Sequence, residues 1–322
     1  MNADSPRRWV PAFVALAAIW GCSFLFIKVA LDQVHPVYVT LGRVAIGAVT
    51  LLLVLVASRD RLPRDPRLWG HLAVVALLAN SMPFTLFGFG EQRASSVLAG
   101  IWNATTPLTT LVFMLAFFPQ ERPTRQRVAG LLVGFVGVLV VLGVWQGIGG
   151  AALTGQLMFF GAATCYGVSF PYIRRFLAGS PNSGTSIAAG QMLMSTVQLA
   201  IAAPLLAGAP PALGSLRLPV VGALLALGAL GTGIAFVLNY RIIRVAGAST
   251  ASTVTYLIPI FATVAGVLVL GEHLTWYEPV GAVVVLAGVA VSQGLLPLPF
   301  TRAARRRVED RQSALVGTGP GE

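Results

Sequence analysis

The sequence predicts an all-α polytopic membrane protein with ten transmembrane helices, arranged as two inverted five-helix repeats. Of the 322 residues, 56% are hydrophobic and only 10% are charged, whereas ordinary soluble domains carry roughly a quarter charged residues. Long apolar runs recur along the whole chain, and motifs of the first half return in the second. This composition excludes a soluble enzyme, a nucleic-acid-binding domain and a disordered protein.

The apolar runs are long enough to cross a bilayer, which takes about 20 mostly apolar residues per helix. They are continuous and do not alternate, which favours helices over barrel strands. The first run is too long for the apolar region of a secretory signal, so we interpret it as an uncleaved span. The ten predicted spans are 9–31, 36–57, 70–90, 94–118, 126–145, 153–173, 184–206, 218–240, 246–270 and 276–296.

The connections between the predicted spans are short, so no soluble domain is inserted. We expect a cytoplasmic N-terminus, a first repeat, an inverted second repeat and a basic cytoplasmic tail, at 1–8, 9–145, 153–296 and 297–322. The two cysteines lie in apolar segments and provide neither a metal site nor a disulfide framework. We therefore expect no cofactor and no metal.

The basic residues predict the orientation. The net charge is +11, from 22 basic residues that include 21 arginines. With a cytoplasmic N-terminus, 18 of them fall on inside segments, and only Arg93 and Arg217 fall outside. This asymmetry predicts that both termini are cytoplasmic in a bacterial-type inner membrane. The basic clusters lack interleaved aromatic residues, so we expect no nucleic-acid partner.

Two motifs repeat in order along the chain. Glu121 is followed nine residues later by Gly130 and seven later again by Gly137, and the same spacing returns in Glu272, Gly281 and Gly288. The segment 20–24, read WGCSF, likewise returns as YGVSF at 166–170. Because each half holds five spans, an odd number, the second half begins on the opposite side of the membrane. Inverted halves of this kind are typical of secondary transporters that work by alternating access.

These motifs resemble the drug/metabolite transporter superfamily, and specifically its EamA-type ten-helix members. The resemblance covers roughly 9–296 and rests on the WGCSF run with Lys28, on Arg43, and on the two proline–glutamate–glycine blocks that begin at Pro107 and Pro259. It implies an inner-membrane transporter, commonly an exporter of amino acids, metabolites or drugs. It also implies that the fourth and ninth spans help to line a central cavity.

Polar and aromatic residues near the middle of the spans are the candidate substrate-binding residues. Polar atoms there either pair between helices or face a wet cavity, because an unpaired polar atom in hydrocarbon is costly. Trp102 beside Asn103 is the pair that we favour most, since tryptophan offers an amphipathic solute a large apolar face and one N–H donor. The full set is Trp20, Arg43, Asn80, Trp102, Asn103, Tyr166, Gln191 and Tyr256.

Arg43 is the candidate contact for an anionic group. It lies seven residues inside the second span, about 10 Å deep at the helical rise. No carboxylate of the spans is expected beside it, so it needs backbone carbonyls, a water network or a substrate carboxylate. Lys28, three residues from the end of its span, is within snorkelling reach of the interface.

Four further residues are candidates for gating or structural roles. Glu121 and Glu272 either cap the helix that follows or form a gating ion pair with an arginine. Pro107 and Pro259 free backbone carbonyls, as in a broken helix that lines a cavity, or they produce a plain kink. Glu91 is expected at the end of the third span, and no acidic residue is expected deep in a span, which argues against catalysis and against a buried proton carrier.

We therefore expect a secondary transporter that moves a small organic solute within the lipid bilayer. The rival interpretation is a lipid-modifying membrane enzyme, which would require an acidic or histidine cluster at one membrane face. A passive channel is a third interpretation. The glycines of the fifth span provide either tight packing or the face of a homodimer.

Overall fold

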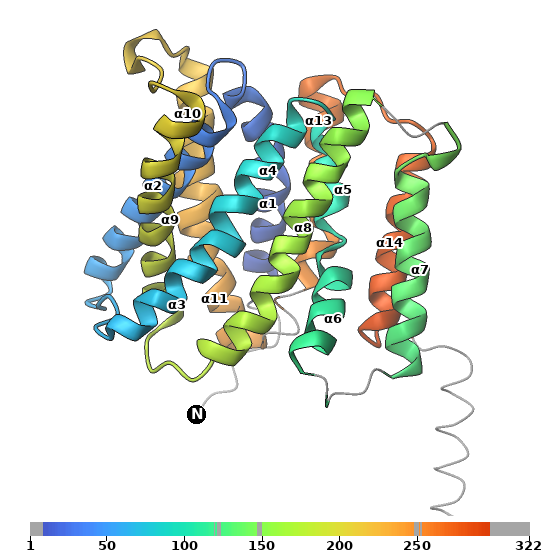
Figure 1. The fold of residues 1–322 in the computed structure, drawn as a ribbon, viewed down its shortest axis with the longest axis horizontal. Helices are drawn as coiled ribbons and strands as arrows, with labels where there is room; N and C mark the ends of the chain where they lie inside the picture. The colour runs from blue at the N-terminus through green and yellow to red at the C-terminus, as the bar shows by residue number, and fades with distance from the viewer. Residues whose placement is uncertain are drawn as a thin grey trace, which may run out of the picture.

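The computed structural model describes residues 9–118, 120, 124–146, 150–247, 251 and 253–296. This part of the chain is helical and contains no β-strand. The helices stand side by side, and α1 (Val10–Ala30) and α8 (Gly150–Phe176) begin at opposite ends of the bundle, α1 at the bottom and α8 at the top of the view (Figure 1). The predicted all-α fold class is confirmed.

The described helices follow the predicted spans. The first half continues with α2 (Pro36–Ala57), α3 (Pro66–Ala76), η1 (Leu77–Ser81), α4 (Met82–Glu91), α5 (Ser96–Asn103), α6 (Thr106–Phe117), α7 (Arg125–Val141) and η2 (Val144–Gln146). After α8, the second half continues with α9 (Gly184–Ala207), η3 (Leu213–Ser215), α10 (Leu218–Leu225), η4 (Ala226–Ile234), α11 (Ala235–Ala246), η5 (Thr253–Tyr256), α13 (Ile258–Leu270) and α14 (Tyr277–Ser292). Among the described residues, seven helices or continuous helix runs are long and apolar enough to cross a membrane, and α14 is a shorter apolar helix.

Local sequence explains where several helices begin. The side chain of Asp65 accepts a hydrogen bond from the Arg67 amide at 2.9 Å, and Ser183 accepts one from the Ser186 amide at 3.0 Å. A side-chain oxygen at this position satisfies an amide that has no partner within the helix. Pro36 occupies the first turn of α2, where its missing N–H costs nothing.

Irregular helix occurs at the same places in both halves. The third crossing segment of each half contains a π-helix, η1 in the first and η4 in the second. The fourth segment of each half is broken just before a proline, with Pro107 in the first turn of α6 and Pro259 in the first turn of α13. The prolines therefore mark broken helices rather than plain kinks, and π-helical turns are frequent at functional sites.

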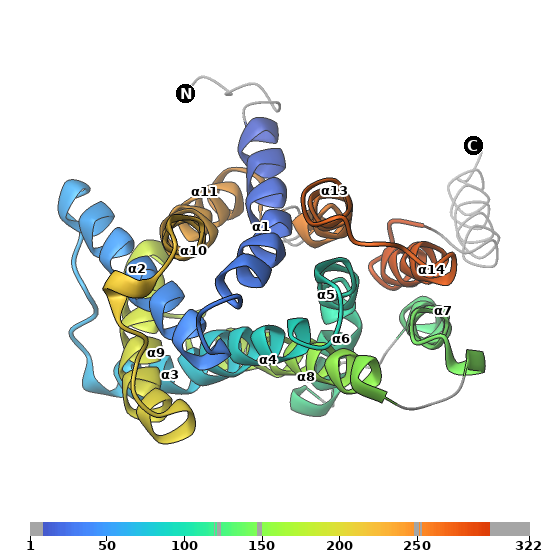
Figure 2. The ribbon, with the colours of Figure 1, turned by 90° about the horizontal axis from the view of Figure 1, so that it is seen from above.

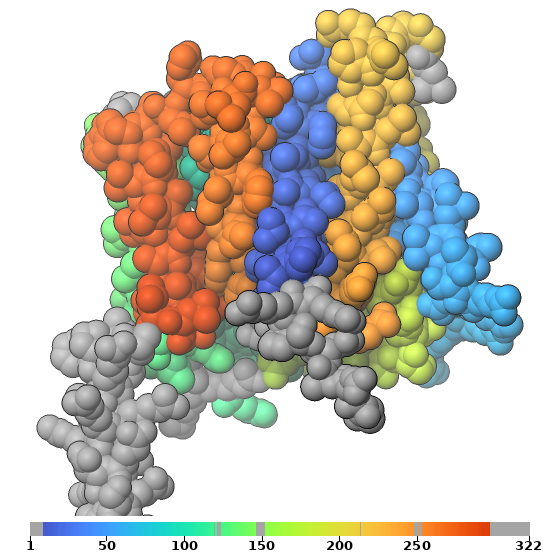
Figure 3. Space-filling model, turned by 180° about the vertical axis from the view of Figure 1, so that it is seen from behind, coloured from blue at the N-terminus to red at the C-terminus, as the bar shows by residue number. Residues whose placement is uncertain are grey.

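The repeated glycines bring the two halves into close contact. A Cβ on Gly21 would lie 2.5 Å from Phe261 Cβ, so α1 of the first half packs tightly on α13 of the second. A Cβ on Gly167 would lie 2.5 Å from Thr109 Oγ1, so α8 of the second half packs in the same way on α6 of the first. Figure 3 shows α1 lying between segments of the second half.

The glycines of α7 and α14 bring the backbones of these two helices into close contact. A Cβ on Gly130 would lie 2.3 Å from the Ser292 nitrogen, and one on Gly288 would lie 2.3 Å from the Gly134 nitrogen. The two helices lie side by side at the edge of the bundle (Figure 2). The glycine face of the fifth span therefore provides tight packing within the chain, while a homodimer stays a prediction.

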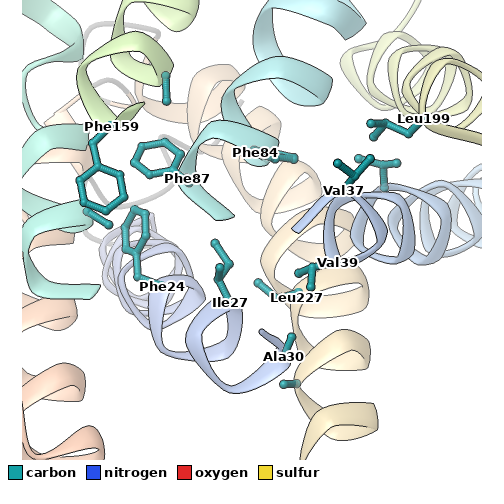
Figure 4. Close-up of a cluster of buried hydrophobic side chains, with 14 of the residues drawn as sticks. Phe24, Ile27, Ala30, Val37, Val39, Phe84, Phe87, Phe159, Leu199 and Leu227 are labelled. Atoms are coloured by element: carbon teal, nitrogen blue, oxygen red, sulfur yellow. The ribbon is translucent and has the colours of Figure 1, made fainter. Parts of the chain in front are cut away.

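An aromatic cluster fills the centre. The rings of Phe24 and Phe87 lie 5.3 Å apart, and those of Phe87 and Phe159 lie 5.7 Å apart. Figure 4 shows these three rings gathered from α1, α4 and α8. Two of the helices belong to the first half and one to the second, so this core joins the halves.

Candidate functional site

Arg43 lies in the interior, between the two halves. Its side chain is only 7% exposed. Its Nε donates to Thr232 Oγ1 at 3.1 Å, its Nη2 donates to the Gly231 carbonyl at 3.5 Å, and its guanidinium stands 3.8 Å from the centre of the Phe84 ring. The third nitrogen, Nη1, has no hydrogen-bond partner among the described residues.

Aromatic and titratable side chains surround Arg43. Tyr166 and Glu91 are close enough to act electrostatically on the guanidinium. The Tyr166 ring lies 6.3 Å from the Phe87 ring, which belongs to the same helix, α4, as Phe84. A guanidinium that is stacked on one face and keeps a free nitrogen can bind a carboxylate, while the rings contact an apolar group.

Two of the predicted site residues have buried polar groups that no hydrogen bond satisfies in the described part of the chain. They are the Asn80 side-chain amide in η1 and the Tyr256 hydroxyl in η5. Asn80 is fully buried. Native proteins satisfy most buried polar atoms, so such exceptions mark candidate ligand or water contacts.

Trp102 lies in a different part of the bundle from Arg43. Its indole Nε1 donates to Gln156 Oε1 at 3.1 Å, and its ring contacts Phe160 edge-on. It also lines a small gap with Val138 of α7 and Val285 of α14. Because Trp102 is buried and its N–H donor is occupied, its contact with a solute stays a prediction.

The remaining predicted site residues are spread along the interior. Trp20 is half-buried between the main core and a smaller cluster around α11. Asn103 ends α5, and Gln191 is buried in α9, which packs against α2 and η1. Of the predicted set, Tyr166 lies within electrostatic range of Arg43, and the structure does not gather the whole set into one site.

Lys28 has a structural role in this conformation. Its ammonium donates to the Glu91 carbonyl and, at 3.1 Å, to the Ala94 carbonyl. A cation at the C-terminal end of a helix satisfies free carbonyls and interacts favourably with the helix dipole. Lys28 thus ties the end of α1 to the end of α4.

Glu272 caps a helix, but not the helix that follows it. Its carboxylate accepts hydrogen bonds from the Ser96 amide at 2.8 Å, the Ser96 hydroxyl at 2.8 Å and the Val97 amide at 3.1 Å. The capped helix is α5 of the first half, so Glu272 joins the two halves. Glu278 serves the start of α14 by accepting from the Thr275 amide. The other predicted residue of this kind, Glu121, lies outside the described residues.

Sequence reasoning missed three residues of this region. Phe84 and Thr232 hold Arg43, yet neither stands out in an apolar span. Glu91 lies at the end of its span, as expected, but its full burial there was not foreseen. The one available signal was that Glu91 precedes a short connection to the next span, which lets the following helix cover it.

The fold and the buried polar residues define a polytopic helical membrane protein built from two inverted halves. The model of the EamA-like transporter family matches residues 7–143 and again residues 153–293. The chain belongs to this family.

Several relatives share most of their length with this chain. The uncharacterized transporter YcxC of Bacillus subtilis is 27% identical over 89% of this chain and 94% of its own. The probable amino-acid metabolite efflux pump of Salmonella typhimurium is 26% identical over 87% of this chain and 93% of its own. A solved crystal structure also resembles this chain. The two match with a TM-score of 0.63 and 21% sequence identity, over 90% of this chain and 98% of that chain, and this likeness shows the fold alone.

Proposed function

We propose that this chain exports small carboxylate-bearing solutes of the amino-acid type across a bacterial-type inner membrane, with both termini cytoplasmic. The observation that carries the proposal is the buried Arg43, whose guanidinium keeps one nitrogen without a partner. A buried guanidinium needs a counter-charge, and a solute carboxylate supplies it. The Salmonella typhimurium relative named as an amino-acid metabolite efflux pump supports this solute class.

The proposed mechanism is alternating access by the two inverted halves. Arg43 belongs to α2 and its partner Thr232 to η4, so the proposed solute site lies on the boundary between the halves. Rocking of one half against the other would open that boundary first to one side and then to the other. The π-helix η4 gives the boundary an irregular backbone where the solute is held.

Counterflow into proteoliposomes tests the solute class. Purified full-length protein is reconstituted with each of the common L-amino acids trapped inside, and uptake of the labelled amino acid is compared with uptake of its amide, which lacks the carboxylate. Arg43→Gln should weaken the apparent affinity for the acids about tenfold, equivalent to about 1.4 kcal/mol, and affect the amides much less. Arg43→Lys should restore part of the affinity, because it keeps the charge but loses the planar fork.

The matched control is Arg217→Gln, because Arg217 is 62% exposed and pairs with Asp32 at 3.2 Å on the surface. It should leave counterflow unchanged. Equal losses for acids and amides in a folded Arg43→Gln protein would show that Arg43 is structural.

Reporter fusions test the proposed orientation. Fusions after residues 33, 92 and 148 should read periplasmic, and those after 62 and 122 cytoplasmic. The reverse pattern would overturn the orientation.

A further inference from the structure

Glu91 is a buried acid that no hydrogen bond satisfies. It ends α4, its side chain is 0% exposed, and neither carboxyl oxygen has a hydrogen-bond partner in the described part of the chain. Glu272, in contrast, accepts three hydrogen bonds. The two acids therefore differ in kind: the Glu272 carboxyl is held in the fold by three hydrogen bonds, and the Glu91 carboxyl by none among the described residues.

The charged groups near Glu91 are engaged elsewhere. Lys28 of α1, Arg43 of α2 and Glu272 of the segment after α13 all act on the carboxyl electrostatically. Lys28 donates to backbone carbonyls and Arg43 to Thr232, so neither cation forms a hydrogen bond with the acid.

The other elements packed against α4 supply little charge. A Cβ on Gly90 would meet the Phe159 ring of α8, and Ser96 at the start of α5 bonds to Glu272. Tyr166 of α8 contacts the Phe87 ring, one helical turn before Glu91. At the start of α2, His35 contacts the ring of Phe89. None of these side chains donates a hydrogen bond to the Glu91 carboxyl.

We propose that Glu91 is the proton-binding site that couples transport to a proton gradient. In the conformation described here the carboxyl is protonated, because an ionised carboxylate without partners is costly in an apolar interior. In another conformation of the cycle, water or the Lys28 ammonium reaches it, and it releases one proton to the aqueous side that is then open. It regains one proton from the opposite side, so one proton crosses per cycle.

Contacts between the halves link this proton to conformation. The Arg43–Thr232 and Glu272–Ser96 hydrogen bonds each join one half to the other, and both charged partners act on Glu91. Movement of one half against the other changes their distances from Glu91, and with them the balance between its neutral and ionised forms. Two conformations with different proton affinities are what coupling requires.

The inference rests on the proposed transport function. The first test therefore uses no solute, so that its outcome does not depend on what the protein transports. Infrared spectra of the full-length protein in lipid nanodiscs at neutral pH should show a protonated carboxylic acid band. Glu91→Gln should remove this band. Asp32→Asn should not, because Asp32 is 59% exposed and paired with Arg217. Absence of the band from the wild type, or its survival in folded Glu91→Gln, would overturn the proposal whatever the protein transports.

The second test measures coupling. Proteoliposomes that contain a trapped pH-sensitive dye are given a mixture of the common L-amino acids. The wild type and Asp32→Asn should move protons, and Glu91→Gln should reduce the initial proton flux at least tenfold. An acid band without solute-driven proton movement, or transport that requires Na⁺ and moves no protons, would overturn the coupling while leaving the transport function intact.

Discussion

The α7–α14 pair and the helices around Arg43 use the interior in opposite ways. Between α7 and α14, glycines face backbone at distances that leave no room for a Cβ, and Val285 and Val289 are fully buried. Around Arg43, the regular helix α2 faces the π-helix η4, and one guanidinium nitrogen has no hydrogen-bond partner among the described residues. We call the first region, the close contact between α7 and α14, the joint. The second region keeps polar groups available for a ligand.

This difference teaches that close helix packing and function are separated along each repeat. The glycine spacing that revealed the repeat belongs mainly to the joint. The boundary between the halves carries polar groups, with Arg43 in the regular helix α2 and Thr232 in the π-helix η4. A change in the joint should therefore affect folding, whereas a change beside Arg43 should affect solute binding more than folding.

The largest effect is expected for Gly288→Val in the joint. Its Cβ would lie 2.3 Å from the Gly134 nitrogen and 2.7 Å from the Gly130 carbonyl oxygen, and backbone cannot yield as a side chain does. We expect a loss of about 3 kcal/mol or more, seen as a large fall in the yield of monodisperse protein. Gly222→Ala is the control, because a Cβ there meets no atom within 4 Å. Equal yields of the two variants would show that the joint is not tightly packed.

A smaller effect is expected for Glu272→Ala, which lies between the two regions. The change removes the acceptor of three hydrogen bonds at the start of α5, and charged hydrogen bonds are strong, so we expect a loss of about 2–3 kcal/mol. Thermal melting in detergent measures it. The exposed control Asp32→Ala should melt close to the wild type. A Glu272→Ala melting curve that matches this control would contradict the capping role.

The sequence predicted the spans and the joint because both depend on local composition and spacing. Apolar runs and glycines at fixed intervals can be read without knowing the partner helix. The site was predicted less completely, since the hydrogen-bond partners of Arg43 come from residues almost 190 positions away. A threonine such as Thr232 carries no sign in the sequence that it faces a guanidinium.

Glu91 and Glu272 illustrate the same limit. Position in a span gives depth along the helix, but burial also depends on what covers the helix end, and the sequence does not show that α5 begins beside Glu91. For Glu272, helix order suggested the following helix as the capped one, whereas the inverted arrangement brings the start of α5 closer. Long-range contacts created by the inverted fold explain both differences.

Trp102→Phe tests whether Trp102 belongs to the packed region or to the solute site. Phenylalanine keeps most of the apolar contact and leaves the Gln156 oxygen without its donor, which should cost about 2 kcal/mol. We expect a lower melting temperature with unchanged apparent affinity in counterflow. Trp276→Phe, on a residue that is 67% exposed, is the matched control. A weakened affinity without loss of stability would instead place Trp102 in the solute site.

The smallest effect on stability, and the sharpest test of the comparison, is expected for Thr232→Val. Valine has nearly the shape of threonine, so the methyl that packs against Gly47 is kept and the hydroxyl is lost. That hydroxyl accepts from Arg43 and donates to the Leu227 carbonyl of its own π-helix at 3.0 Å. The bond from Arg43 should be worth about 1 kcal/mol, and the short-range bond within the helix adds little. Because the guanidinium loses the contact that fixes its direction, the apparent affinity for carboxylate solutes should fall several-fold, while that for amides changes little. Thr50→Val, which removes a hydroxyl bonded only within its own helix, should change neither. If Thr232→Val lowers stability as much as Glu272→Ala and leaves solute affinity unchanged, the region around Arg43 is a structural joint of the same kind as α7 and α14.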